Sequence, residues 1–103
     1  MTDSLPIIVT PVAAELIRKA DDWWRVNRAS ARVTVWQEVQ QAFTAVASEP
    51  RIGSRARDVQ LPNVQRIFLP VIKQYLYYRV LTRPDRIEVL ALWHRRRGKG
   101  PPI

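Results

Sequence analysis

The 103-residue sequence contains no cysteine, and His94 is its single histidine. Without cysteine the chain has neither disulfide bonds nor thiolate ligands for a metal ion, and a lone histidine excludes any site that needs two imidazoles. A structural zinc site is thereby excluded. We expect the protein to work without a metal ion and without another cofactor.

Long apolar runs are also missing. No unbroken apolar stretch approaches the roughly 20 residues that a membrane-spanning helix requires. The first four residues, Met-Thr-Asp-Ser, do not form a basic region followed by an apolar stretch, so no export signal is expected. These absences predict a cytoplasmic protein that makes no contact with a membrane.

Acidic residues are scarce in the second half of the chain. Residues 1–50 hold five Lys/Arg and six Asp/Glu, a net charge of −1, whereas residues 51–103 hold twelve Lys/Arg and three Asp/Glu, a net charge of +9. A neutral half joined to a strongly basic half indicates a directed positive surface. We expect this surface to meet an anionic target or an acidic partner chain.

The first residues predict a short strand that leads directly into a helix. Residues 5–9 are rich in Ile and Val, and Thr10 followed by Pro11 is the pattern of a helix N-cap with proline at the first helical position. From Pro11 to about Arg28 the apolar residues recur at helical spacing. We therefore expect a strand over 5–9 and a helix over 11–28.

A second helix is predicted after a short polar break at residues 27–30. Ser30 is the expected N-cap, apolar residues recur at helical spacing over 35–46, and Pro50 ends the pattern. Two amphipathic helices joined by so few residues must pack antiparallel. The resulting helical hairpin is predicted to bury Trp24, Trp36 and Phe43.

The second half of the chain predicts a loop and three strands. Residues 51–63 are rich in Gly, Ser, Pro and Asn and poor in apolar residues, which is typical of a loop. Three β-rich runs follow at 64–69, 73–81 and 86–93, and the last two are linked by the turn sequence Thr-Arg-Pro-Asp. In the last strand, strict alternation places four residues on one face: Ile87, Val89, Ala91 and Trp93.

The predicted fold class is α+β. A short N-terminal strand precedes an antiparallel helical hairpin, which packs on one face of a small antiparallel sheet completed by three C-terminal strands. The length suits one domain over 1–103. A basic tail from about 95 to 103 is expected to stay extended until it is bound, because its glycines and prolines do not readily continue a strand or a helix.

His94 is the one side chain of a type that changes charge near neutral pH, so it is the first candidate for acid–base chemistry. It stands at the end of the last predicted strand and is followed directly by Arg95, Arg96 and Arg97. A structural role, in which the imidazole caps the sheet edge or bonds the loop, explains its presence equally well. Both interpretations remain open.

The order of these elements and several short sequences together resemble those of a known protein family. Trp23-Trp24 and Asn27-Arg28 close the first helix, Tyr77-Tyr78-Arg79-Val80 forms a strand, and Leu92-Trp93-His94-Arg95 ends the last one. In this order and spacing, over nearly the whole chain, they resemble the RelE/ParE superfamily of bacterial toxin–antitoxin toxins. The resemblance implies either of two activities: RelE-type members cut messenger RNA on the ribosome, and ParE-type members poison DNA gyrase.

The nuclease pattern of RelE-type members is only half present. Their basic pair on the second strand falls on Arg66 and Phe68, and their third-strand arginine falls on Tyr75. Their basic turn matches His94-Arg95, and their terminal tyrosine falls close to Pro101. If the chain is a ribosome-dependent nuclease, the resemblance implies His94, Arg95 and Arg66 as catalytic residues. The missing positions favour a ParE-like gyrase inhibitor that is not an enzyme, and an inactive binding module of the same fold is a further alternative.

The resemblance also implies a cognate acidic antitoxin as a partner, in addition to the target, which is DNA gyrase or, in the alternative, the ribosome with its messenger RNA. The cationic residues of the second half are the candidates for contact with the antitoxin or the target. They are Arg51, Arg55, Arg57, Arg79, Arg95, Arg96, Arg97 and Lys99.

Overall fold

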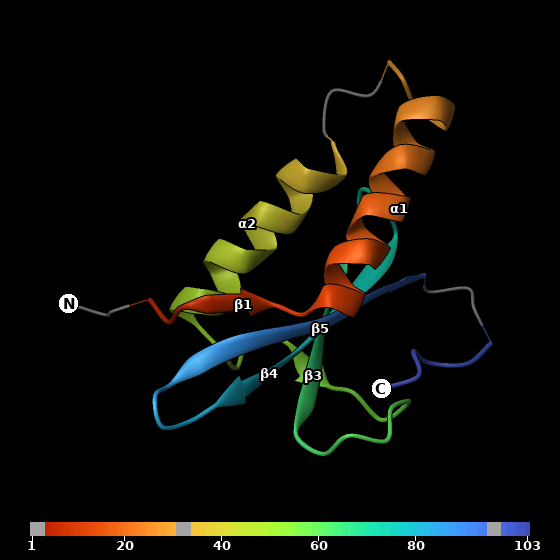
Figure 1. Ribbon diagram of the computed structural model, residues 1–103. Helices are drawn as coiled ribbons and strands as arrows, with labels where there is room; N and C mark the ends of the chain where they lie inside the picture. Colours follow the sequence, from red (N-terminus) through yellow and green to blue (C-terminus); the bar gives the residue numbers. More distant parts are fainter. Residues whose placement is uncertain (1–3, 31–33, 95–97) are drawn as a thin grey trace.

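The computed structural model describes residues 4–30, 34–94 and 98–103. A helical hairpin covers one face of a five-stranded sheet, and the described C-terminal end lies on the other side of that sheet (Figure 1). The elements, in chain order, are β1 (Ile7–Val9), α1 (Pro11–Asn27), α2 (Val35–Ser48), β2 (Ser54–Arg55), β3 (Val64–Leu69), β4 (Gln74–Leu81) and β5 (Arg86–His94). The predicted α+β class is confirmed.

Helix α1 begins as predicted at Thr10 and Pro11. The Thr10 hydroxyl oxygen accepts a hydrogen bond of 3.2 Å from the N–H of Ala13, and its hydroxyl donates one of 2.9 Å to the carbonyl of Val89. Pro11 occupies the first helical position, where no N–H is needed. One residue thus caps the helix and also ties its start to strand β5.

Helix α2 begins later than predicted. Its N-cap is Thr34, whose side chain accepts from the N–H of Gln37 while the Gln37 side chain accepts from the N–H of Thr34. This reciprocal capping box satisfies two N–H groups that would otherwise be unpaired, so the prediction of Ser30 as the cap is wrong. Trp36, in the first turn, is 39% exposed rather than buried in the core, while Trp24 and Phe43 pack against the core as predicted.

The strand order in the sheet is β1-β5-β4-β3-β2. Strands β3, β4 and β5 form the predicted antiparallel meander. Two features differ from the prediction. Strand β1 runs parallel to β5, which makes the sheet mixed, and the two-residue strand β2 lies within the segment predicted to be a loop and pairs with β3.

A β-bulge in β5 changes which side chains share a face. Tyr77 pairs with Ala91 and Tyr78 pairs with Val89, so Leu90 is an extra residue between them. Ile87 and Val89 therefore face the helices, whereas Ala91 and Trp93 belong to the opposite face. The predicted common face for these four residues is wrong beyond Val89, because the extra residue reverses the alternation.

Each face of the sheet has its own apolar cluster. Beneath the helices, residues of α1 and α2 pack on the sheet through Ile17, Val39, Leu76, Tyr78 and Val89, all almost completely buried. On the opposite face, which we call the second face, a smaller cluster contains Tyr77, Leu90 and Ala91. Val59, Leu61 and Ile103 pack against this second cluster, so the loop before β3 and the end of the chain cover part of the second face.

The described part of the tail is docked rather than free. The carbonyl of Ile103 accepts hydrogen bonds from the N–H groups of Gln60 (2.8 Å) and Leu61 (3.3 Å), and the Trp93 indole N–H donates to the carbonyl of Lys99 (2.7 Å). Pro101 is buried. Residues 98–103 form no helix or strand, and their backbone is held by the loop before β3.

Candidate protein-binding groove

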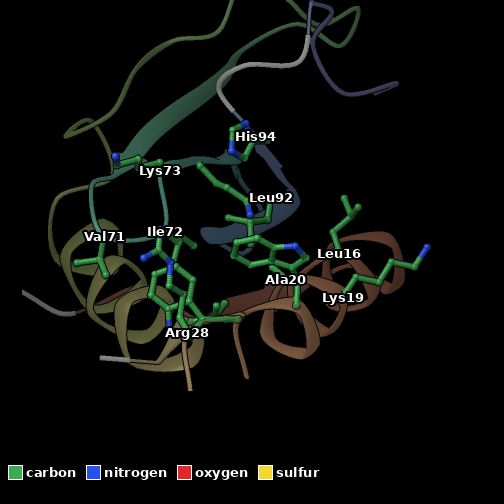
Figure 2. A pocket seen from close by; sticks show the side chains of 13 residues that line it. Leu16, Lys19, Ala20, Arg28, Val71, Ile72, Lys73, Leu92 and His94 are labelled. Atoms are coloured by element: carbon green, nitrogen blue, oxygen red, sulfur yellow. The ribbon is translucent and has the colours of Figure 1, made fainter. Parts of the chain in front are cut away.

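A cavity of about 940 Å³ lies between α1, the turn that joins β3 to β4, and the end of β5 (Figure 2). We call it the groove. It is lined by residues from each of these elements and from the start of α2: Leu16, Lys19, Ala20, Trp23, Trp24, Arg28, Val35, Val71, Ile72, Lys73, Gln74, Leu92 and His94.

The floor of the groove is apolar. Leu16, Ala20 and Trp24 follow one another at four-residue intervals along α1, so they form a continuous stripe on one side of the helix. Ile72, in the turn between β3 and β4, and Leu92, in β5, complete the floor. Trp23, beside this stripe, is 55% exposed. Exposed apolar surface of this kind is typical of a site where another molecule binds.

The rim of the groove is cationic. Its charges are Lys19 on α1, Arg28 at the C-cap of α1, and Lys73 in the turn before β4. His94, at the end of β5, lies on the same rim. In Figure 2, Lys73 and His94 lie on one side of the cavity and Arg28 on the other. None of the thirteen described residues that line the groove is acidic. An apolar floor with a positive rim suits a partner segment that carries apolar and acidic side chains together.

A buried carboxylate holds the turn that forms one wall. Glu38, on α2, is 6% exposed, and its side chain accepts hydrogen bonds from the N–H groups of Val71 (2.8 Å) and Ile72 (2.9 Å). The next residue, Lys73, has a φ of 58°, and its N–H donates to the carbonyl of Leu69 (2.8 Å). This tight turn places Val71, Ile72 and Lys73 at the edge of the groove.

The second face carries a different cluster around Asp58. The Tyr77 hydroxyl donates to the Asp58 carboxylate (2.6 Å), and the Arg66 guanidinium lies 3.4 Å from the same oxygen and 4.0 Å from the centre of the Tyr75 ring. Burial and the hydrogen bond to Asp58 raise the pKa of Tyr77 to about 12. Tyr77 is therefore a neutral donor at physiological pH, and Arg66 already has an anionic partner.

The structure does not bring the predicted nuclease residues together. Arg66 contacts Tyr75 and Tyr77 on the second face, whereas His94 pairs with Gln74 and lines the groove on the helix face. The sheet separates the two side chains. Arg95, with Arg96 and Arg97, lies outside the described residues.

The other predicted contact residues are spread over the surface, away from the groove lining. Arg79 forms an ion pair of 2.7 Å with Glu88, so its charge is already balanced. Arg51, Arg55 and Arg57 are exposed around β2, and Lys99 is exposed in the docked tail.

Sequence reasoning missed the cations of the groove, which are Lys19, Arg28 and Lys73. The sequence could have indicated Lys19, because this residue is adjacent to Ala20 in the apolar stripe of α1. Lys73 gave no such signal, because its position depends on how the turn before β4 is held.

Neither a membrane-spanning helix nor a metal site is found in the part of the chain that the structure describes. No helix in these ranges is both long and apolar enough to cross a membrane. No group of three or more His, Asp or Glu side chains within residues 4–30, 34–94 and 98–103 is arranged to hold a metal ion.

Comparisons with known proteins bear on the whole fold and not on single residues. A solved structure, described as the chromosomal ParDE TA system from P. aeruginosa, superposes with a TM-score of 0.66 over 88% of this chain and 96% of that chain, at 16% sequence identity. At that identity the likeness shows the fold. The comparison with curated proteins found no match. The family model described as "ParE toxin of type II toxin-antitoxin system, parDE" matches residues 7–98, so the chain belongs to the ParE toxin family.

Proposed function

We propose that this ParE-family toxin is a cytoplasmic protein that arrests growth by interfering with DNA gyrase, and that a cognate antitoxin neutralises it by occupying the groove. The family match supports the toxin role. The observation that carries the antitoxin part is the groove itself, with its apolar floor and its rim of Lys19, Arg28 and Lys73.

The chemistry of the groove describes the antitoxin segment that it fits. Apolar side chains of the antitoxin would pack on the stripe formed by Leu16, Ala20 and Trp24, as in other complexes where an amphipathic segment lies in a groove. Carboxylates flanking them would face the cations of the rim. Because the second half of the chain has a net charge of +9, an acidic segment is also attracted over a distance.

A gyrase inhibitor is supported over a nuclease by the state of the second face. A nuclease needs basic and acid–base groups that converge on one phosphate. Here Arg66 is paired with Asp58, and Tyr77, with a pKa of about 12, keeps its proton at physiological pH. His94 lies on the opposite face of the sheet from both. This arrangement offers no such convergence among the described residues.

A brief expression experiment separates the candidate functions. If gyrase is the target, growth stops with DNA breaks and a DNA-damage response, and purified toxin inhibits supercoiling by gyrase in vitro. Cleavage of translated messenger RNA, abolished by His94→Ala or Arg66→Ala in folded protein, would instead establish the nuclease. Growth that continues unchanged would indicate an inactive binding module.

The antitoxin part is tested by binding kinetics. The reading frame beside that of the toxin is expected to encode a short chain with an acidic, amphipathic C-terminal part. Its association rate with the toxin should fall steeply as the salt concentration rises, because steering between opposite charges is screened. An association rate that is equal at low and high salt would contradict the electrostatic part of the proposal.

A further inference from the structure

The last six residues, 98–103, form a strap across the second face of the sheet. Three hydrogen bonds hold its backbone, two from the N–H groups of Gln60 and Leu61 to the carbonyl of Ile103 and one from the Trp93 indole to the carbonyl of Lys99. Ile103 packs against the apolar cluster of the second face, which contains Leu90 and Ala91. The strap is therefore attached to both strand β5 and the loop before β3.

Docking of the strap depends on a glycine at position 100. A Cβ atom added there would lie 2.0 Å from the carbonyl oxygen of Asp58 and 2.7 Å from its carboxylate. Any side chain would therefore collide with backbone that cannot move aside easily. At Gly98, in contrast, an added Cβ atom meets nothing within 4 Å. Glycine to alanine should therefore disrupt docking of the strap at position 100 and leave it unchanged at position 98.

The strap and the groove share the end of strand β5. Trp93, which holds the strap on the second face, is followed directly by His94, which lines the groove on the helix face. These two residues form the last pairs of the β4–β5 ladder, with Tyr75 and Gln74. Strand β1 pairs with residues 87–89 of β5, so Trp93 and His94 lie beyond that pairing.

A second physical connection passes through Leu16. Its side chain packs against the apolar clusters of both faces and also lines the groove. Leu16 therefore connects the cluster beneath the strap with the groove floor through direct packing. A packed path of this kind can carry coupling between two sites when an element along it, here the docked or released strap, has two arrangements.

We propose that the strap is a positioning element for the groove, so that docking of the strap and binding of the antitoxin stabilise each other from opposite faces of the sheet. This inference rests on the proposed function of the groove as the antitoxin site. A docked strap fixes Trp93 and thereby the end of β5, which forms one wall of the groove. By linkage, a ligand that binds this wall must favour the docked strap to the same extent.

The first test uses hydrogen exchange of the free, full-length protein. The amides of Gln60 and Leu61 report docking directly, because they donate to the Ile103 carbonyl. In Gly100→Ala these two amides and those of Leu92 to His94 should exchange faster than in the wild type, while Gly98→Ala should match the wild type. Trp93→Phe, which removes the bond to the Lys99 carbonyl and keeps an aromatic ring, serves as a milder second variant. Unchanged exchange at the end of β5 in Gly100→Ala, with Gln60 and Leu61 released, would overturn the proposal.

The second test measures affinity for the purified cognate antitoxin. Gly100→Ala should bind it about fivefold or more weakly than Gly98→Ala, the lower end of usual coupling between sites. In the wild-type complex, exchange of the Gln60 and Leu61 amides should slow, although they lie on the face away from the groove. Equal affinities of the two variants would overturn the coupling alone, whereas an antitoxin that fails to bind the wild type would overturn the proposed function as well.

Discussion

The carboxylate of Glu38 accepts a hydrogen bond of 2.9 Å from the backbone N–H of Ile72, 34 positions later in the chain. The other oxygen of the same carboxylate accepts from Val71. One buried side chain of α2 thus replaces the partners that the N–H groups of this turn would otherwise find in water. The turn between β3 and β4, which forms one wall of the groove, is thus held in place by a residue of α2.

Replacing Glu38 by Ala should destabilise the fold, because the buried N–H of Ile72 and the partly buried N–H of Val71 would lose their acceptor. We expect a loss of about 2–4 kcal/mol in the free energy of unfolding, measured by urea denaturation. Gln41→Ala, at an exposed position of the same helix, should change the free energy of unfolding by less than about 0.5 kcal/mol. Similar stabilities for the two variants would contradict the role given to Glu38.

Reversing one charge at the groove should weaken antitoxin binding. Lys73→Glu places a carboxylate on the rim and should raise the dissociation constant about tenfold or more. Arg55→Glu makes the same change of charge on β2, outside the groove lining, and should alter the constant by less than about threefold. Titrations at two salt concentrations measure both constants. A larger effect of Arg55→Glu would place the antitoxin on another surface.

The hydroxyl of Tyr78 secures the chain after α2. It accepts a hydrogen bond of 3.0 Å from the N–H of Gly53 and donates one of 2.8 Å to the carbonyl of Pro50. Tyr78→Phe should cost about 1–3 kcal/mol in the free energy of unfolding, because both backbone groups lose their partner. Tyr75→Phe, a half-buried tyrosine with ring contacts to Phe68 and Tyr77, should cost less than about 0.5 kcal/mol.

Stability should fall at alkaline pH because of Tyr77. Its pKa is raised from 10.0 to about 12 in the folded protein, so the folded state favours the neutral phenol more strongly than the unfolded state does. The contribution is fully present below pH 10 and is lost as the pH rises toward 12. Tyr77→Phe should flatten the decrease in unfolding free energy over this interval. An equally steep decrease in the variant would assign it to other groups.

Local signals in the sequence predicted the elements well. Thr10 and Pro11 predicted the start of α1 correctly, because an N-cap and a first-turn proline act within a few residues. The start of α2 was misplaced, although Thr34 and Gln37 show the spacing of a capping box. The meander of β3, β4 and β5 followed from its β-rich runs and turns.

The candidate site was less accessible to prediction, because it depends on contacts between distant residues. The extra residue Leu90 moves Trp93 to the second face, and no period-two pattern reveals a bulge. The tail has the composition of an extended segment, yet the close approach of Gly100 to Asp58 lets it dock. The position of Lys73 depends on Glu38, which lies on a different element. Composition indicated the positive charge, but the fold decides where it borders apolar surface.

The pairing of β1 with β5 has a consequence for the newly made protein. The hydroxyl of Thr10 meets the carbonyl of Val89, 79 positions away, and Ile17 of α1 packs in the same cluster as Ile87. Until Ile87 and the rest of β5 have been synthesised, β1 has no strand to pair with and α1 has no strand β5 to pack on. Pairings between such distant parts of the chain form late in folding. The groove is completed equally late, because Leu92 and His94 of its lining are added after Ile87.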